Sequence, residues 1–253
     1  MVIFSAINDE IGNSLTEQLK CLRKNKVKFI EFRKIDNKFL FELNKIEIDT
    51  ILQLLKRSNI LVSMIDTPIG KPKYQISEED IYMIFEKYIK IAKIFNTDKL
   101  RIFSDITDDV LIRLCKFAQK NSINLFMENE KNTRFTSFDY FVKLQNKIKM
   151  KNLFVLFDVE NYFSCNGKEQ YLKDFNKYSN IIKYIHLRDY DNNYTIITNG
   201  KLDITDILNQ ISNKPFDIFV SLESHLPMVS FKDKKYLFSE NMKKIRKKIS
   251  KRW

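Results

Sequence analysis

Four side chains that could bind a metal ion stand at or near the ends of apolar runs. The runs Leu125–Glu130, Phe154–Asp158, Ile181–His186 and Ile218–Glu223 supply Glu128, Asp158, His186 and Glu223. The intervals between these four residues are 30, 28 and 37 positions, each long enough for one helix and two loops of a βα repeat. Three carboxylates and one imidazole suit a hard or borderline divalent ion. The pattern therefore predicts one metal site where successive parallel strands end.

Alternation along the predicted strands indicates that these side chains point inward. Glu128 shares a strand face with Glu130, and Glu223 shares one with His225. Taken singly, a glutamate at a strand end is more often a surface charge, and a histidine is more often a hydrogen-bonded structural group. Without a cation, clustered carboxylates would also raise one another's pKa and destabilise the fold. The combination of four ligand types at this spacing favours a metal site.

The elements that would position this site alternate between short apolar runs and amphipathic segments. The predicted strands are Val2–Ile7, Val27–Ile35, Ile60–Ile65, Leu100–Ser104, Leu125–Glu130, Leu153–Val159, Ile181–Asp189 and Asp217–Ser224. The predicted helices are 14–26, 49–58, one from about 77 to 95, 108–120, 137–149, 168–178, 204–211 and one that includes 238–249. An open doubly wound sheet would show a glycine-rich turn after its first strand, and Asn8–Gly12 contains a single glycine. We therefore predict an α/β fold, a single (β/α)8 TIM barrel domain over residues 1–253.

Composition narrows the class of protein. The chain has 253 residues, of which 44% are hydrophobic, enough for the core of one barrel. It contains no apolar run of eighteen residues, so we expect no membrane partner. Cys21, Cys115 and Cys165 are odd in number and widely spaced, which favours a reduced, cytoplasmic compartment.

The formal net charge of +12 could indicate nucleic acid or another polyanion as a partner. The densest cluster of positive charge is Lys243–Arg252, within a basic C-terminal helix and tail at about 232–253. Because lysine is abundant throughout the chain, a solvated helix face explains this cluster more simply. We therefore expect a small-molecule partner rather than nucleic acid.

Several segments together resemble one known family. They are Met127–Lys131, Phe157–Tyr162, Tyr184–Asp189 and Ser221–Leu226, with Glu31–Arg33, Pro68–Lys71 and Arg101–Ser104 as further matching blocks. The chain is similar to the xylose isomerase-like TIM barrel superfamily, and within it to the sugar phosphate isomerase/epimerase group. The resemblance implies one divalent metal ion (Mn²⁺, Mg²⁺, Co²⁺ or Zn²⁺), bound by Glu128, Asp158, His186 and Glu223. It also implies that Glu128 and Glu223 form the catalytic acid/base pair.

The resemblance implies a sugar or sugar phosphate as substrate and isomerisation or epimerisation next to a carbonyl as reaction. Eight side chains are then candidates for substrate binding: Glu31, Arg33, Lys71, Arg101, Glu130, Asn161, Arg188 and His225. Among them, Arg33, Lys71, Arg101 and Arg188 are the candidates for a phosphate or carboxylate group. A homo-oligomer is also common in similar proteins.

Three other functions share this fold. A keto-polyol dehydratase would use the same four ligands, and a sugar-binding protein could keep the fold without activity. Enzymes of the endonuclease IV type use a histidine-rich trinuclear zinc site, which the two histidines of this chain cannot fill. The chain also departs from the family pattern in two places. Arg188 stands where lysine is common, and the segment Thr198–Asp203 lacks one of two usual glycines.

Overall fold

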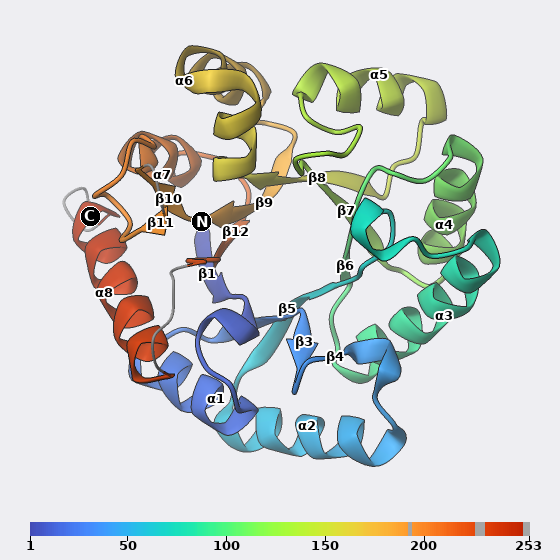
Figure 1. The fold of residues 1–253 in the computed structure, drawn as a ribbon, viewed down its shortest axis with the longest axis horizontal. Coiled ribbons are helices and arrows are strands. Elements are labelled where there is room, and N and C mark those ends of the chain that lie inside the picture. The colour runs from blue at the N-terminus through green and yellow to red at the C-terminus, as the bar shows by residue number, and fades with distance from the viewer. Residues whose placement is uncertain (192–193, 226–230, 250–253) are drawn as a thin grey trace.

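In the computed structural model, eight parallel strands form a barrel with helices around its outside (Figure 1). The structure describes residues 1–191, 194–225 and 231–249. The strands are β1 (Val2–Ala6), β2 (Phe29–Phe32), β5 (Leu61–Asp66), β6 (Lys99–Ile102), β7 (Asn124–Glu128), β8 (Leu153–Asp158), β9 (Ile182–Leu187) and β12 (Ile218–Leu222). Their order is β1-β12-β9-β8-β7-β6-β5-β2, and a parallel bridge between Ile7 and Glu31 links the two edge strands. The predicted (β/α)8 barrel is confirmed.

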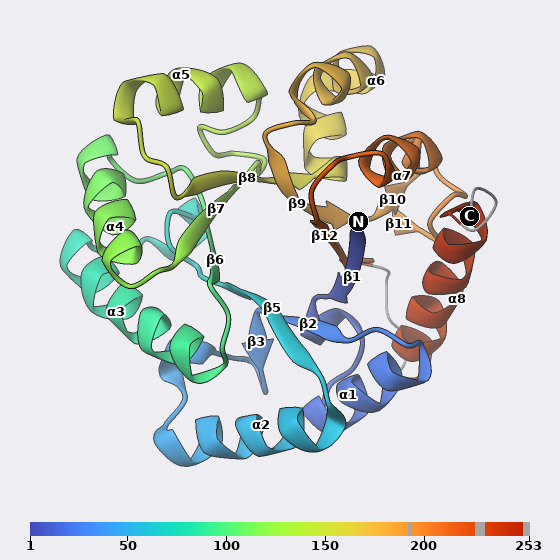
Figure 2. The same cartoon turned by 180° about the vertical axis from the view of Figure 1, so that it is seen from behind.

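Eight α-helices surround the barrel in the described residues, as the view from behind also shows (Figure 2). They are α1 (Leu15–Lys24), α2 (Lys45–Ser58), α3 (Glu78–Ile94), α4 (Asp108–Lys120), α5 (Phe138–Ile148), α6 (Val159–Tyr178), α7 (Ile204–Ser212) and α8 (Phe231–Ile249). Each presents one apolar face to the strands, as Leu111, Leu114 and Ala118 of α4 illustrate. None of the described helices is long and apolar enough to cross a membrane.

Two helices begin earlier than their sequence pattern predicts, because capping side chains decide where they start. Helix α2 begins at Lys45 rather than Asp49, since Asn44 and Glu47 form a reciprocal capping box. Helix α6 begins at Val159 rather than Lys168, because the Asp158 carboxylate accepts the Asn161 N–H at 2.7 Å. Gly167, with φ of 75°, kinks α6, so the predicted segment 168–178 is its second half.

The interior of the barrel holds a small apolar cluster that is separate from the main core. It consists of Met64, Phe126, Leu156 and Tyr184, with the partly buried Phe154 and Phe219 against it. The main core lies between the strands and the helices and extends along α8 through Phe238, Met242 and Ile245. The predicted basic C-terminal segment is described as far as residue 249, and residues 250–253 lie outside the described residues.

Short elements follow the C-terminal ends of three strands and therefore lie at the same end of the barrel. The hairpin β3–β4 (Lys34–Ile35 and Lys38–Phe39) follows β2, and the 3-10 turn Pro72–Tyr74 follows β5. The hairpin β10–β11 (Asp189–Tyr190 and Tyr194–Thr195) follows β9.

The loop after β9 is built around the carboxylate of Asp189, which accepts the backbone N–H groups of Thr198, Gly200 and Leu202. A Cβ atom at Gly200 would meet Asp189 Oδ1 at 2.1 Å, so this position requires glycine. Thr198 has φ of 74°, a left-handed conformation that a β-branched residue rarely adopts. A glycine would adopt this backbone at Thr198 without strain.

Candidate metal centre and substrate cavity

The four predicted ligands converge at the C-terminal end of the barrel. Glu128 ends β7, Asp158 ends β8, His186 lies in β9, and Glu223 follows β12. One ligand atom from each lies within 4.8 Å of all the others, and all four residues are buried. Donors at about 2.0–2.2 Å from one ion lie within roughly 4.4 Å of one another, so the cluster needs small shifts to hold a divalent ion. The residues present therefore fit such a metal.

His186 is held between carboxylates on both ring nitrogens. Its Nε2 lies 2.7 Å from Glu31 Oε1, and its Nδ1 lies 3.2 Å from Glu128 Oε1 and 3.5 Å from Glu223 Oε2. Burial lowers the pKa of His186, but the negative charges of Glu31 and Glu128 outweigh it and raise the pKa well above its usual value. Nδ1 is thus the nitrogen that faces the ligand cluster.

Arginine side chains contact the ligand carboxylates. Arg101 Nη1 lies 2.9 Å from Glu128 and 3.2 Å from Asp66. Arg188 lies 2.9 Å from Asp158 and 3.4 Å from Glu223. Both guanidinium groups are buried, so their charges act on the carboxylates with little screening by water.

These contacts shift the pKa values of the ligand carboxylates in opposite directions. Burial raises the pKa of Glu128, but Arg101 and His186 more than offset this and lower it to about 2. The pKa of Glu223 also lies well below its usual value, because nearby positive charges, chiefly His225 and Arg188, outweigh burial. For Asp158, burial outweighs the attraction of Arg188 and raises the pKa to about 7. The surroundings therefore favour the charged forms of Glu128 and Glu223 and the neutral form of Asp158.

A second group of charged side chains holds Glu223 from the other side. His225 Nε2 lies 3.0 Å from Glu223 Oε1, and its Nδ1 lies 3.0 Å from Glu10 Oε1. Arg33 Nη1 lies 2.5 Å from the same Glu223 oxygen. His225 has φ of 43°, a conformation that non-glycine residues adopt at some cost and that is enriched at functional sites.

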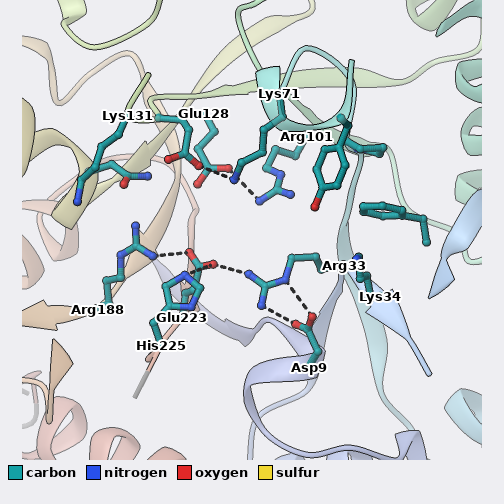
Figure 3. A pocket seen from close by; sticks show the side chains of 15 residues that line it. Asp9, Arg33, Lys34, Lys71, Arg101, Glu128, Lys131, Arg188, Glu223 and His225 are labelled. Atoms are coloured by element: carbon teal, nitrogen blue, oxygen red, sulfur yellow. Dashed lines mark hydrogen bonds and ion pairs between the residues drawn. The ribbon is translucent and has the colours of Figure 1, made fainter. Parts of the chain in front are cut away.

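A cavity of about 360 Å³ opens in front of the ligand cluster (Figure 3). This size suits a small-molecule site. It is lined by Asp9, Arg33, Lys34, Phe39, Pro68, Lys71, Tyr74, Arg101, Glu128, Glu130, Lys131, Asn161, Arg188, Glu223 and His225. Lys71 lies 2.6 Å from Glu130, and the rings of Phe39 and Tyr74 pack edge to face with centroids 5.1 Å apart. The cavity thus has carboxylates at the metal cluster, an aromatic pair on one wall, and many cations.

The structure brings most of the sequence-predicted site residues to this cavity. Those that line it are Arg33, Lys71, Arg101, Glu128, Glu130, Asn161, Arg188, Glu223 and His225. Asp158 and His186 are fully buried and join the cluster without lining the cavity. Glu31 does not line it either: its side chain is fully buried and contacts His186. The Glu31 side chain therefore faces His186 in the structure rather than the cavity.

Sequence reasoning missed several residues at the site. Asp66 is fully buried, contacts Arg101 and ends the apolar run of β5, which is the same signal that identified Asp158. Asp9, Lys34, Phe39 and Tyr74 line the cavity from short elements that follow strands, and no periodic pattern points to them.

Comparisons with known proteins agree with this fold. The chain matches the model of the xylose isomerase-like TIM barrel family over residues 19–248. Among curated protein sequences, none matches the chain significantly.

Solved structures are similar over nearly the whole chain. One is the probable 3-DHS dehydratase AsbF of Bacillus anthracis, with a TM-score of 0.77 and 16% identity over 95% of this chain and 97% of that one. Another is the IOLI protein with a bound zinc atom, with a TM-score of 0.78 and 14% identity over 99% of both chains. A third is an L-ribulose 3-epimerase, with a TM-score of 0.75 and 12% identity over 99% of this chain and 97% of that one. Since the family match covers most of the sequence, the chain belongs to the xylose isomerase-like TIM barrel family.

Proposed function

We propose that the chain is a divalent-metal-dependent isomerase or epimerase of a sugar or sugar phosphate. The observation that carries this proposal is the convergence of two glutamate carboxylates, Glu128 and Glu223, at one buried four-ligand cluster that borders the cavity. They come from β7 and from the end of β12, which β8 and β9 separate in the barrel wall, so they approach the cavity from different sides (Figure 3). Membership of the family and similarity to an epimerase support the same conclusion.

The residues of the chain can perform the proton transfers that this reaction needs. A divalent ion held by Glu128, Asp158, His186 and Glu223 supplies polarisation of a substrate carbonyl when bound. One of the two glutamates removes the proton from the carbon next to the carbonyl. The other, after it has taken up a proton from water, returns that proton to the neighbouring carbon in an isomerisation or to the opposite face in an epimerisation.

Neighbouring side chains would orient these glutamates and stabilise the negative charge that develops on the substrate. Arg101 and Arg188, next to the carboxylates, are placed to stabilise negative charge on a substrate oxygen. His225 and Arg33 both contact Glu223 Oε1 and so fix the orientation of that carboxylate.

The lining of the cavity supports an anionic sugar, such as a sugar phosphate. Its cations are Arg33, Lys34, Lys71, Arg101, Lys131 and Arg188. A phosphate or carboxylate would exchange the existing ion pairs, such as Lys71 with Glu130, for charge-assisted hydrogen bonds of its own. The Phe39 and Tyr74 rings offer an apolar surface for the C–H face of a sugar.

A dehydratase acting on a keto-polyol is the second candidate. One of the two glutamates could remove the proton next to a carbonyl and then, as the protonated acid, deliver that proton to the departing hydroxyl group, which leaves as water. The similarity to the probable 3-DHS dehydratase favours this alternative over a nuclease or a non-catalytic sugar-binding protein. A cytoplasmic location and a homo-oligomer complete the proposal, with a small molecule rather than nucleic acid as the partner.

Metal content and proton exchange test the proposal. Elemental analysis of the purified protein should find about one divalent ion per chain, and the Glu128→Gln/Glu223→Gln variant should bind it more weakly. The exposed Glu79 and Glu169, changed to Gln together, provide the matched control and should bind as the wild type does. Three zinc ions per chain would instead favour the nuclease, and no binding of added Mn²⁺, Co²⁺ or Zn²⁺ would refute the proposal.

The reaction itself is identified in deuterated water. Sugars and sugar phosphates incubated with the Mn²⁺- or Co²⁺-loaded protein should gain deuterium next to the carbonyl carbon, and the Glu128→Gln/Glu223→Gln variant should not catalyse this. Mass spectrometry then separates the candidates, because a dehydratase product is lighter by one water and an isomer is not.

A further inference from the structure

A chain of buried polar groups runs from the interior of the barrel to the ligand cluster. The Tyr184 hydroxyl donates to Glu31 Oε2 at 2.8 Å, and Glu31 Oε1 lies 2.7 Å from His186 Nε2. On the far side, Ser63 Oγ lies 3.0 Å from the Tyr184 hydroxyl and 2.7 Å from Ser5 Oγ. All five side chains are essentially inaccessible to water.

This series of polar groups is notable because Tyr184 also belongs to the small apolar cluster inside the barrel. Burying a carboxylate and a phenol is unfavourable unless their polar atoms are hydrogen-bonded. Glu31 satisfies this requirement with Tyr184 on Oε2 and His186 on Oε1, and the buried Asp66 and Ser221 also interact with its carboxylate. The hydrogen bond from Tyr184 thus helps to orient the Glu31 carboxylate, which in turn contacts the His186 ring.

The ring of Tyr184 is itself held in place by packing. It stacks on Phe219 with centroids 5.6 Å apart and planes at 10°, and it meets Phe126 edge to face at 5.9 Å. Tyr184 also precedes His186 by two positions in β9, so both side chains point to the same side of the strand. The packed ring therefore holds the hydroxyl between Glu31 and Ser63.

We propose that Tyr184 is a positioning residue of the metal centre, acting through Glu31 to orient the His186 ring. With Nε2 donating to Glu31, the Nδ1 nitrogen is directed at Glu128 and Glu223, where a metal ion would bind. Outer hydrogen-bond partners of metal-binding histidines fix the ring and its tautomer, and their loss weakens metal affinity by about 10–100-fold. This inference rests on the metal-dependent function proposed above.

The test compares two buried tyrosines. Tyr184→Phe removes the hydroxyl and keeps the packed ring. Tyr171→Phe is the matched control, because Tyr171 is equally buried and its hydroxyl has no hydrogen-bond partner among the described residues. Competition with a chromophoric chelator should show Zn²⁺ or Co²⁺ bound about tenfold more weakly by Tyr184→Phe and unchanged within twofold by Tyr171→Phe. The visible spectrum of bound Co²⁺ should also change in the first variant alone.

A double-mutant cycle tests whether Tyr184 acts through Glu31. Glu31→Gln should weaken metal binding by about 10–100-fold. Adding Tyr184→Phe to that variant should change the affinity less than twofold, because the route through Glu31 is already broken. Full additivity would refute the proposed route.

The outcomes also separate this inference from the proposed function. If the wild type binds no divalent metal, both fail together. If the wild type binds metal and Tyr184→Phe binds it equally well with an unchanged Co²⁺ spectrum, the positioning role is refuted and the proposed function stands. If both Phe variants lose affinity alike, the effect of Tyr184→Phe is general destabilisation, which also overturns the inference.

Discussion

Amide replacements of two ligand carboxylates should change the stability of the protein in opposite directions when a chelator keeps metal away. Glu128 lies beside Arg101 and His186, which outweigh burial and lower its pKa to about 2. Asp158 contacts Arg188, but burial dominates and raises its pKa to about 7. The fold therefore favours the charged form of Glu128 and the neutral form of Asp158.

The sign and size of each effect follow from proton linkage. The folded-state pKa of Glu128 lies below its unfolded value, so its charge stabilises the fold above pH 4.5 and this contribution is lost as the pH falls toward 2. The shift corresponds to about 3 kcal/mol, and Glu128→Gln should lower the free energy of unfolding at pH 8 by that order.

Asp158 has the opposite sign. Its folded-state pKa is raised, so the stability it contributes is present below pH 3.8 and lost as the pH rises through 7. Asp158→Asn should therefore raise the free energy of unfolding by up to about 4 kcal/mol at pH 8, and by only about 2 kcal/mol at pH 5. The amide oxygen can still accept the Asn161 N–H that starts α6, so the helix cap is kept.

Urea unfolding followed by circular dichroism, with EDTA at pH 8 and pH 5, measures both changes. The exposed Glu79→Gln serves as the control and should stay within about 0.5 kcal/mol of the wild type. The reasoning is refuted if both amide variants shift stability in the same direction, or if the Asp158→Asn gain does not shrink at pH 5.

Four further predictions use other parts of the molecule. In urea unfolding, Gly70→Ala should lower the free energy of unfolding by about 2–4 kcal/mol, and Gly167→Ala by about 1 kcal/mol. Both glycines have φ near 75°, but only at Gly70 would an added Cβ meet a backbone oxygen, at 2.3 Å. Thr198→Gly should raise the thermal midpoint by relieving its positive φ, worth about 1 kcal/mol. Lys71→Met should raise the KM for a sugar phosphate about tenfold and leave the KM for the free sugar nearly unchanged. The pKa of His225 is raised to about 10, because neighbouring carboxylates outweigh burial. The stability that its charge contributes is therefore lost as the pH rises from 6.5 to 10. In EDTA, His225→Gln should reduce the change in unfolding free energy over this pH range by about 1–2 kcal/mol, a value that allows for screening by water.

Much of the candidate site could be predicted from the sequence because its ligands end buried strands. An apolar run identifies a strand, and a charged residue where the run ends marks the mouth of a parallel barrel. Glu128, Asp158, His186 and Glu223 carry this signal, and the spacing of βα repeats then brings them together. Asp66 carries it too, at the end of β5, and was missed because the predicted strand stopped at Ile65.

Partners across the barrel could not be predicted in the same way. The sequence indicates that Glu31 and Tyr184 share the inner faces of their strands with the ligands, but 153 positions separate the two residues. Their contact depends on how far each strand is shifted along its neighbours, and on the bulge between Ile30 and Glu31 in the pairing of β2 with β5. Strand register of this kind is a property of the closed barrel.

The sequence by itself determined the fold class, the order of the elements and the four ligands, because these depend on periodicity and on residue type within single strands. The tertiary structure decided which charged side chains are ion-pair partners. It placed Arg101 beside Glu128 and Arg188 beside Asp158, set Glu31 next to His186, and brought Phe39 of β4 and Tyr74 of a 3-10 turn to one wall of the cavity. These arrangements depend on distances between segments far apart in the chain, and such distances are fixed only when the barrel closes and excludes water from the groups inside it.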